Sequence, residues 1–300
     1  FYARNANDTY QCRKGEDAEG HQLTGSNNTT HIYTLQNHQL NGLHHWASNQ
    51  LELDWGTPFG KTSSKEPDRK QVMYIHEDGK WNLFKLNRQE TMRYFGYLNE
   101  EEWNGNLGLK WKFNENSFVK AGINYKDKNR DYMGTRFYYN LNRLNPDIKS
   151  IYDTDGFLNT ENIANGSIIV ERKKQPKDSY MAGTEIWAGY VMADFYPVEK
   201  LLVNLGLRYE RSRQWVKYAS DGGDWYAKCR NMKTSDFFPT LNLKYALDEA
   251  NSLRFSASRT VTRPSFIEMA PFLYQESYGA AQIRGNENLE NGYNYNVDLR

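Results

Sequence analysis

Apolar and polar side chains alternate with a period of two along several short stretches of the chain. In residues 106–113 every second side chain is apolar, namely Leu107, Leu109, Trp111 and Phe113. A polar turn follows at residues 114–117, and residues 119–126 alternate again. This pattern is typical of strands with one apolar and one polar face, and the turn predicts an antiparallel hairpin.

The same unit recurs along the chain. Further alternating runs cover residues 51–55, 187–195, 201–210, 237–245, 253–258 and 293–300. Tight polar turns join some runs, and long connections join others, which we expect at residues 127–182, 212–236 and 262–292. Because short and long connections alternate, all the long ones must fall at one end of the sheet. Outer-membrane barrels have short periplasmic turns and long outer loops, whereas a soluble sandwich has no reason for that asymmetry.

The polar face of these strands carries charges in mid-strand. They are Lys110, Lys112, Lys120, Lys126, Arg208, Glu210, Lys244 and Arg254. A Lys or Arg on the lipid side would cost about 2–4 kcal/mol at the bilayer midplane, so we expect this face to line a wet lumen. We therefore predict an all-β, antiparallel transmembrane barrel, present here in part, with about eight to ten strands.

Composition agrees with this prediction without proving it. The mean hydropathy is -0.89 and no long apolar run appears, which excludes a transmembrane helix but not a barrel, whose strands are only half apolar. Aromatic residues make up 15% of the chain, with 22 Tyr and 8 Trp, as in interfacial girdles or sugar-binding surfaces. The net charge of +1 gives no basic field for nucleic acid. A Tyr-rich soluble β-protein stays open on composition alone.

The last third of the chain resembles a known family. An S-x-T-x-x-R-P element at residues 258–264 precedes an E-x-A-P-F loop at 268–272, and a G-N-x-x-L turn follows at 285–289. Residues 188–194 and 204–210 look like paired strands of the same family. Together they resemble the barrel of TonB-dependent outer-membrane receptors, over roughly residues 106–300.

The resemblance implies a barrel of about 22 strands around a plug, in the bacterial outer membrane, that imports scarce nutrients with energy from TonB. We expect residues 1–300 to be a fragment of one such barrel domain, without the plug and the C-terminal strands. The expected partners are outer-membrane lipid, TonB acting through a plug region, and a surface lipoprotein. No cofactor is implied. The ligand stays open among iron chelates, glycans, peptides and cobalamin-like cofactors.

Aromatic side chains near the long connections are the candidate ligand contacts. They are Trp215, Trp225, Tyr226, Tyr138 and Tyr139. Exposed aromatics at the outer end could stack on sugar rings or other flat ligands, although packing against neighbouring loops or an interfacial girdle explains them equally well. Arg263-Pro264 is interpreted as a structural element of the rim rather than as a ligand clamp.

Two other groups of residues carry weaker signals. Five histidines, His21, His31, His38, His44 and His45, fall in a stretch that looks like a polar loop, but no Cys or carboxylate lies at a ligand-like spacing, so we predict no metal site. Cys12 and Cys229 lie in loop-like stretches and could form a disulfide in an oxidising compartment, or remain free thiols.

Three functions remain at this point. The first is a receptor and transporter part, the second a passive porin or structural barrel subunit, and the third a secreted, β-rich carbohydrate-binding protein. Catalysis finds no support, because the chain has no G-x-S-x-G, H-E-x-x-H or phosphate-loop motif. The protein is therefore not expected to be an enzyme.

Overall fold

A single antiparallel sheet dominates the computed structural model, which describes residues 1–300 except 85–90, 142–147, 173–177, 220–227, 249 and 275–282. The main strands are β1 (Tyr2–Glu16), β2 (Gln22–His38), β5 (Phe59–Glu77), β7 (Met92–Asn114), β8 (Ser117–Leu141), β10 (Ser179–Val198), β11 (Leu201–Tyr218), β12 (Lys228–Ala246), β13 (Ser252–Thr262) and β16 (Gly292–Leu299). The shorter elements are β3 (Asn41–Trp46), β4 (Leu51–Gly56), β6 (Lys80–Leu83), α1 (Thr160–Ala164), β9 (Ile168–Arg172), β14 (Leu273–Tyr274) and β15 (Ile283–Arg284).

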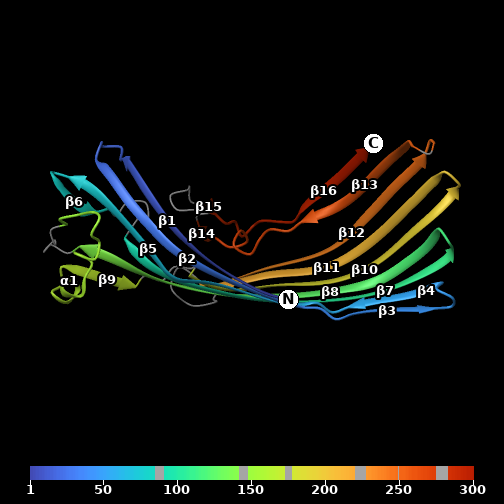
Figure 1. Ribbon diagram of the computed structural model, residues 1–300, viewed down its shortest axis with the longest axis horizontal. Coiled ribbons are helices and arrows are strands. Elements are labelled where there is room, and N and C mark those ends of the chain that lie inside the picture. Colours follow the sequence, from blue (N-terminus) through green and yellow to red (C-terminus); the bar gives the residue numbers. More distant parts are fainter. Residues whose placement is uncertain (85–90, 142–147, 173–177, 220–227, 249, 275–282) are drawn as a thin grey trace.

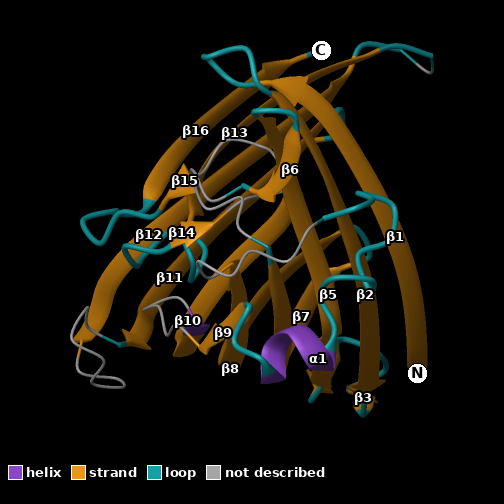
Figure 2. Ribbon diagram, turned by 90° about the vertical axis from the view of Figure 1, so that its left-hand side faces the viewer, coloured by secondary structure: helices purple, strands orange, loops and turns teal. Residues whose placement is uncertain are grey.

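The main strands lie side by side in chain order, from β1 at one edge to β16 at the other. The sheet curls into a trough that does not close on itself (Figures 1 and 2). This confirms the prediction of a partial antiparallel barrel with about eight to ten wall strands. No helix among the described residues is long and apolar enough to cross a membrane.

Two wall strands are each broken into two segments. The Cα partners His38–Phe59 of β2–β5 and Asn41–Gly56 of β3–β4 keep one register, so β2 and β3 are halves of one strand and β4 and β5 are halves of the next. The breaks fall near Leu40 and Pro58, and the backbone N–H of Thr57 still donates to the carbonyl oxygen of Leu40 at 2.9 Å. Proline has no N–H for a ladder, so Pro58 suits such an interruption.

Short turns lie at one end of the trough and most long connections at the other, as predicted. Residues 47–50, 115–116, 199–200, 247–248 and 250–251 form the short-turn rim, on the right in Figure 1. The opposite end, which we call the long-loop rim, is where β8 and β11 end, at Leu141 and Tyr218, and where β10 and β12 begin, at Ser179 and Lys228. The turn at residues 17–21, between β1 and β2, is a short exception at the long-loop rim.

The strands reach further toward the long-loop rim than the alternation indicated. Residues 127–141, 212–218 and 228–236 are strand, so the predicted loop boundaries at 127, 212 and 236 are wrong. In these upper parts both faces of the sheet carry polar side chains, and a period-two pattern is invisible where both faces are polar.

The first 45 residues form strands rather than the polar loop expected around the histidines. Cys12 lies on β1 and Cys229 on β12, so the loop assignment of both cysteines is also wrong; the structure has them as free, exposed thiols. The pairing of β1 with β2 runs over the full length of β1, from Tyr2–Gln36 to Glu16–Gln22. Backbone pairing forms these strands even though their side chains are polar on both faces.

The ladder between β12 and β13 is short. It joins residues 240–246 to 252–258, whereas the ladder between β11 and β12 runs over the whole of both strands. Above Thr240 the two strands separate, and side chains bridge the gap: Arg259 Nη1 donates to the carbonyl oxygen of Phe237 at 2.9 Å. The junction between β12 and β13 is therefore weakly paired in its upper part.

Candidate functional site

The concave and convex faces of the sheet differ in chemistry. On the convex face, large apolar side chains are exposed over the lower half of the wall: Leu107, Leu109, Trp111, Phe113, Ile123, Trp187, Val191, Leu205, Leu207 and Phe237. Alternate positions on the same strands carry charges and point to the concave side. An apolar outer band around a polar interior is the arrangement of an outer-membrane barrel wall.

Ion pairs cross the concave face from strand to strand. Lys120 Nζ lies 2.5 Å from Asp54 Oδ1, and Lys126 Nζ lies 2.9 Å from Glu102 Oε1. Higher on the same strands, Lys128 bridges Glu102 at 2.8 Å and Glu100 at 3.1 Å. Such half-exposed pairs add only about 0–1 kcal/mol each, but they neutralise charges along a wet surface. We call this set of paired side chains the polar inner wall.

One loop folds down onto the polar inner wall. We call it the strap; it comprises residues 263–274 and 283–291 between β13 and β16 and includes β14 and β15, seen inside the trough in Figures 1 and 2. Its apolar side chains Phe266, Met269 and Phe272 are buried. They form a core with wall residues Tyr180, Ala182, Val216, Tyr218 and Met232. The strap thus has its own hydrophobic contact with the inside of β10–β12.

Polar contacts fix the strap at its two ends. Arg263 Nη2 lies 2.6 Å from Glu210 Oε2, and Gln214 Nε2 donates to the carbonyl oxygen of Pro264 at 2.6 Å. At the other end, Tyr218 donates its hydroxyl to Glu287 Oε2 at 2.8 Å. Glu210 and Gln214 are buried, so these contacts are shielded from bulk water.

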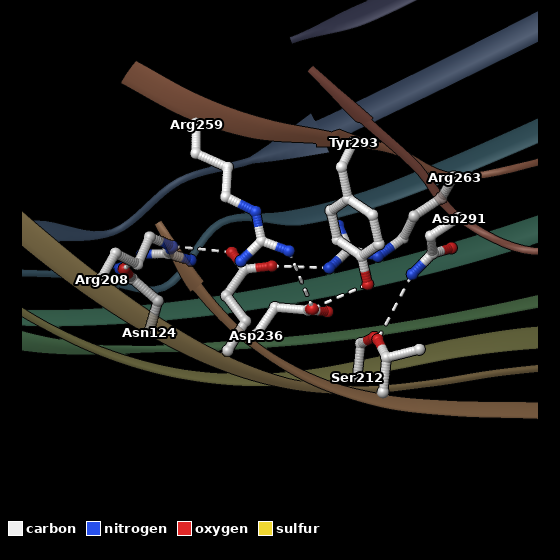
Figure 3. Close-up of polar contacts among 10 residues, drawn as sticks. Asn124, Arg208, Ser212, Asp236, Arg259, Arg263, Asn291 and Tyr293 are labelled. Atoms are coloured by element: carbon white, nitrogen blue, oxygen red, sulfur yellow. Dashed lines mark hydrogen bonds and ion pairs between the residues drawn. The ribbon is translucent and has the colours of Figure 1, made fainter. Parts of the chain in front are cut away.

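Glu210 is the centre of a longer chain of contacts. Its second oxygen accepts from Arg208 Nε at 2.7 Å, and Arg208 Nη1 donates to Asn124 Oδ1 at 2.6 Å on β8. Figure 3 shows Arg208 and Asn124 at the left, and Arg263 reaching down toward the same group of contacts from the other side. The Glu210 carboxylate on β11 is therefore linked to the strap through Arg263, and to β8 through Arg208 and Asn124.

A second group bridges the junction between β12 and β13. Tyr293 on β16 donates its hydroxyl to Asp236 Oδ1 at 2.7 Å, and Arg259 Nη2 lies 3.8 Å from the same oxygen. Figure 3 shows Arg259 and Tyr293 reaching from above toward Asp236. Asn291 Nδ2 donates to Thr234 Oγ1 at 3.3 Å nearby.

Several buried polar atoms at this interface have no hydrogen-bond partner among the described residues. They are Gln214 Oε1, Arg230 Nε, Asp236 Oδ2, Arg259 Nε, Arg263 Nε and Asn291 Oδ1. Native proteins satisfy most buried polar groups. The interface between strap and wall therefore has spare capacity for a polar solute or for water.

The strap is also ordered within itself. The backbone N–H of Ser265 donates to Glu268 Oε2 at 2.7 Å, and this contact holds the pKa of the Glu268 carboxyl below its ordinary value. The N–H groups of Glu268 and Met269 donate back to the carbonyl oxygen of Ser265. Residues 263–272, which carry the R-P and E-x-A-P-F elements, thus form a folded turn, which agrees with a structural role for Arg263-Pro264.

The chain matches a known protein family over almost its whole length. A family model described as "TonB dependent receptor-like, beta-barrel" matches residues 2–300. The chain belongs to this family. Its members are bacterial outer-membrane proteins, so the receptor chain has an outer-membrane location, and the secreted alternative is set aside.

Solved structures of similar shape are receptors and transporters. The chain is similar to the siderophore receptor PiuA from Acinetobacter baumannii, with 11% identity, 87% of this chain and 48% of that chain covered, and a TM-score of 0.37. The copper transporter OprC has 11% identity and a TM-score of 0.44, with 99% of this chain and 45% of that chain covered. The unliganded ferric citrate transporter FecA has 12% identity and a TM-score of 0.39, with 87% of this chain and 42% of that chain covered. The receptor chain spans less than half the length of these proteins. A search of curated proteins found no match.

Of the aromatic residues predicted as ligand contacts, the three that the structure describes are not brought together. Trp215 lies on β11, where its ring covers Gly183 of β10, and Lys217 lies 5.5 Å from the ring centre. Tyr138 is buried on β8, and Tyr139 packs against a second core cluster near α1 and β9. Trp225 and Tyr226 lie outside the described residues. A shared aromatic binding surface stays a prediction.

The predicted histidine group is dispersed along β1–β4. His21 lies in the turn after β1, where its Nδ1 donates to Asp17 Oδ2 at 3.0 Å, whereas His31 and His44 lie on β2 and β3. Among the residues that the structure describes, no group of three or more His, Cys, Asp and Glu side chains could hold a metal ion.

Sequence reasoning missed most of the strap's partners. Glu210 was expected on the wet face, but Gln214, Tyr218 and Asp236 fell in a segment expected to be loop. The signal was available in the register: continuing the period of two past Glu210 places Ser212, Gln214, Val216 and Tyr218 on the inner face.

Proposed function

We propose that the receptor chain forms part of the wall of a TonB-dependent receptor that binds a nutrient at the cell surface and imports it. In this proposal the apolar outer face holds the wall in lipid, the polar inner wall gives a wet path, and the strap narrows that path from inside. TonB, acting through a plug region elsewhere in the native protein, supplies the energy. A surface lipoprotein at the long-loop rim is a further proposed partner.

The strap on the polar inner wall carries the proposal. A passive pore needs an open lumen, whereas a gated transporter needs interior segments that occupy it. Here the strap covers β10–β12 and is fixed by a charge-assisted contact between Arg263 and Glu210. Its buried polar atoms without partners give the interior a capacity for polar contacts.

The rival from the same membrane is a porin-like or structural barrel. It would share the two-faced sheet but would conduct solutes without TonB. Family membership supports the receptor over this rival. The candidate nutrients are iron chelates, copper, cobalamin-like cofactors, peptides and glycans, and the experiment below distinguishes among them.

Growth under limitation tests the proposal. The full-length native protein is produced in a host bacterium that has an outer membrane but lacks its own TonB-dependent receptors. Two host strains are compared, one with a working TonB and one without it. Each nutrient class is supplied as the only limiting source, below the concentration at which it enters by diffusion. We expect one class to restore growth only when both the receptor and TonB are present.

Two outcomes would count against import by this protein. Equal growth without TonB would favour the passive barrel. Surface labelling of Cys229 would show whether the protein is correctly inserted. If inserted protein supports growth on none of the nutrient classes, the proposed import function is wrong and a structural role is favoured.

A further inference from the structure

Three cations on the convex face lie directly above the apolar band. On β11, the outward positions Leu205, Leu207 and Tyr209 are followed upward by Arg211 and Arg213. On β12, Lys233 lies beside Arg213 as its cross-strand partner. We call Arg211, Arg213 and Lys233 the basic patch.

A hollow of about 1060 Å³ opens at the basic patch. Its lower lining is apolar and aromatic, with Ile123, Trp187 and Tyr209. Its upper lining is the basic patch together with Glu185 and the hydroxyl-bearing Ser235. Ser212 and Thr234 also line it, but their hydroxyls hydrogen-bond each other on the concave side of the sheet. Gly189 also lines it and contributes no side chain. The hollow is therefore apolar toward the membrane centre and cationic toward the long-loop rim.

The charges of the basic patch are not neutralised by the protein. None of the three cations has an ion pair with any of the described residues, and Arg213 Nε donates only to the neutral Asn231 Oδ1 at 3.3 Å. The carboxylate of Glu185, opposite Arg213 on β10, accepts from Trp187 Nε1 at 3.0 Å. One carboxylate thus faces three cations, whereas the cations of Lys120 and Lys126 on the polar inner wall, and that of Arg263 on the strap, have carboxylate partners.

The neighbouring strand limits the patch to one side. At the same height, the outward positions of β8 carry Asp127 and Asp131, and Asp127 is the cross-strand partner of Glu185. An anion would be repelled there and attracted on β11–β12. The basic patch is therefore a local feature, and not part of a uniform ring of charge.

We propose that the basic patch binds the phosphate groups of a phosphorylated glycolipid from the outer leaflet, with its acyl chains along Ile123, Trp187 and Tyr209. Arg is suited to bidentate contacts with phosphate oxygens, and aromatic side chains favour the depth where chains meet headgroups. Clustered cations beside a bilayer bind anionic lipid headgroups. This inference needs the outer-membrane location of the chain, but it does not depend on which nutrient is imported.

Lipid retention by the purified, full-length receptor tests the inference. The protein is stripped of lipid in non-ionic detergent and mixed with a bis-phosphorylated, acylated glucosamine disaccharide, and native mass spectrometry counts the bound molecules. The test variant combines Arg211→Gln, Arg213→Gln and Lys233→Gln. The matched control removes the same charge elsewhere, with Lys14→Gln, Lys61→Gln and Lys228→Gln.

We expect the wild type and the control to retain the glycolipid, and the test variant to bind it at least about tenfold more weakly. The single change Arg213→Lys keeps the charge but loses the planar fork, so an intermediate loss is expected even if the triple variant fails to fold. Heat-modifiable electrophoretic mobility checks that each variant is folded.

Three results would overturn the inference. Equal retention by the folded test variant would show that the patch does not bind the lipid. Equal binding of the dephosphorylated disaccharide would remove the role of phosphate. Binding of inorganic phosphate as tight as that of the glycolipid would make the patch a site for the free anion instead.

Discussion

The lower and upper halves of the wall follow different rules. Near the short-turn rim, the outward side chains are apolar, such as Leu205 on β11 and Ile123 on β8. Toward the long-loop rim, the same faces carry Arg211 and Arg213 on β11, and Asp127 on β8. The inward faces stay polar along most of this length. The outer face therefore changes from apolar to charged within single strands.

Strand length explains the difference. A transmembrane strand needs about 9–11 residues to cross the hydrocarbon core. Strand β11 has 18 residues, so roughly its upper half extends above the lipid. The type of outward side chain therefore depends on its depth in the membrane. It is apolar where lipid chains surround the wall, and charged where headgroups and water surround it. Only the lower half therefore needs alternating apolar and polar side chains, because only there does one face of the sheet meet lipid.

The largest effect is expected from placing a charge on the apolar outward face of the lower half. Leu205→Arg places a cation on the lipid face near mid-depth, so we expect a loss of about 2–4 kcal/mol in the free energy of unfolding. The measurement is reversible urea unfolding of the full-length receptor in phospholipid vesicles.

The matched control is Met133→Arg on β8, an outward apolar residue near the long-loop rim that is 58% exposed. Its expected loss is about 0–1 kcal/mol. If the two substitutions cost the same, the division of the wall by depth is wrong.

A smaller effect is expected on the inner face of the upper half. Arg263→Ala leaves the buried Glu210 with Arg208 as its remaining cation and frees one end of the strap. We expect a loss of about 1–3 kcal/mol in local stability, seen as faster hydrogen exchange of backbone amides in residues 264–272. Lys61→Ala, which removes the exposed pair with Glu101, serves as the control and should leave this exchange unchanged.

The smallest effect concerns the turn above the upper half, between β1 and β2. The hydrogen bond with Asp17 raises the pKa of His21 above its ordinary value. A raised pKa in the folded state means that the contact stabilises the turn below about pH 6.5 and that this contribution is lost as the pH rises through the folded pKa. Asp17→Asn should lower the pKa of His21, measured by NMR titration of histidine-labelled receptor in nanodiscs. An unchanged titration would remove the contact as the cause.

The sequence allowed prediction of the lower half and little of the upper half. Residues 106–113 and 201–210 alternate because one face meets lipid and the other meets water, and both are strands. Residues 127–141 and 212–218 were expected to be loop, because charged residues such as Asp127 and Arg213 replace the apolar ones on the outward face above the lipid. Backbone pairing with neighbouring strands, which a single sequence does not display, extends the sheet there.

The candidate site was predicted only in part, for a related reason. The polar face was visible, and Glu210 was correctly placed on it. The strap's position was not visible, because the contacts of Gln214 with Pro264 and of Tyr218 with Glu287 join residues far apart in the sequence. The aromatic residues chosen as ligand contacts, such as Trp215 and Tyr138, were selected by type alone, and residue type does not reveal direction on a strand whose register is unknown.

The short ladder between β12 and β13 has a mechanical consequence. Along most of the wall, separating two strands means breaking many backbone hydrogen bonds together, but above Thr240 the strands are held by side chains such as Arg259, Tyr293 and Asp236. A pulling force across the sheet would therefore open this seam more readily than the adjacent junction between β11 and β12, whose ladder runs over both strands. Because the strap begins at the end of β13, such an opening would lift it from the wall.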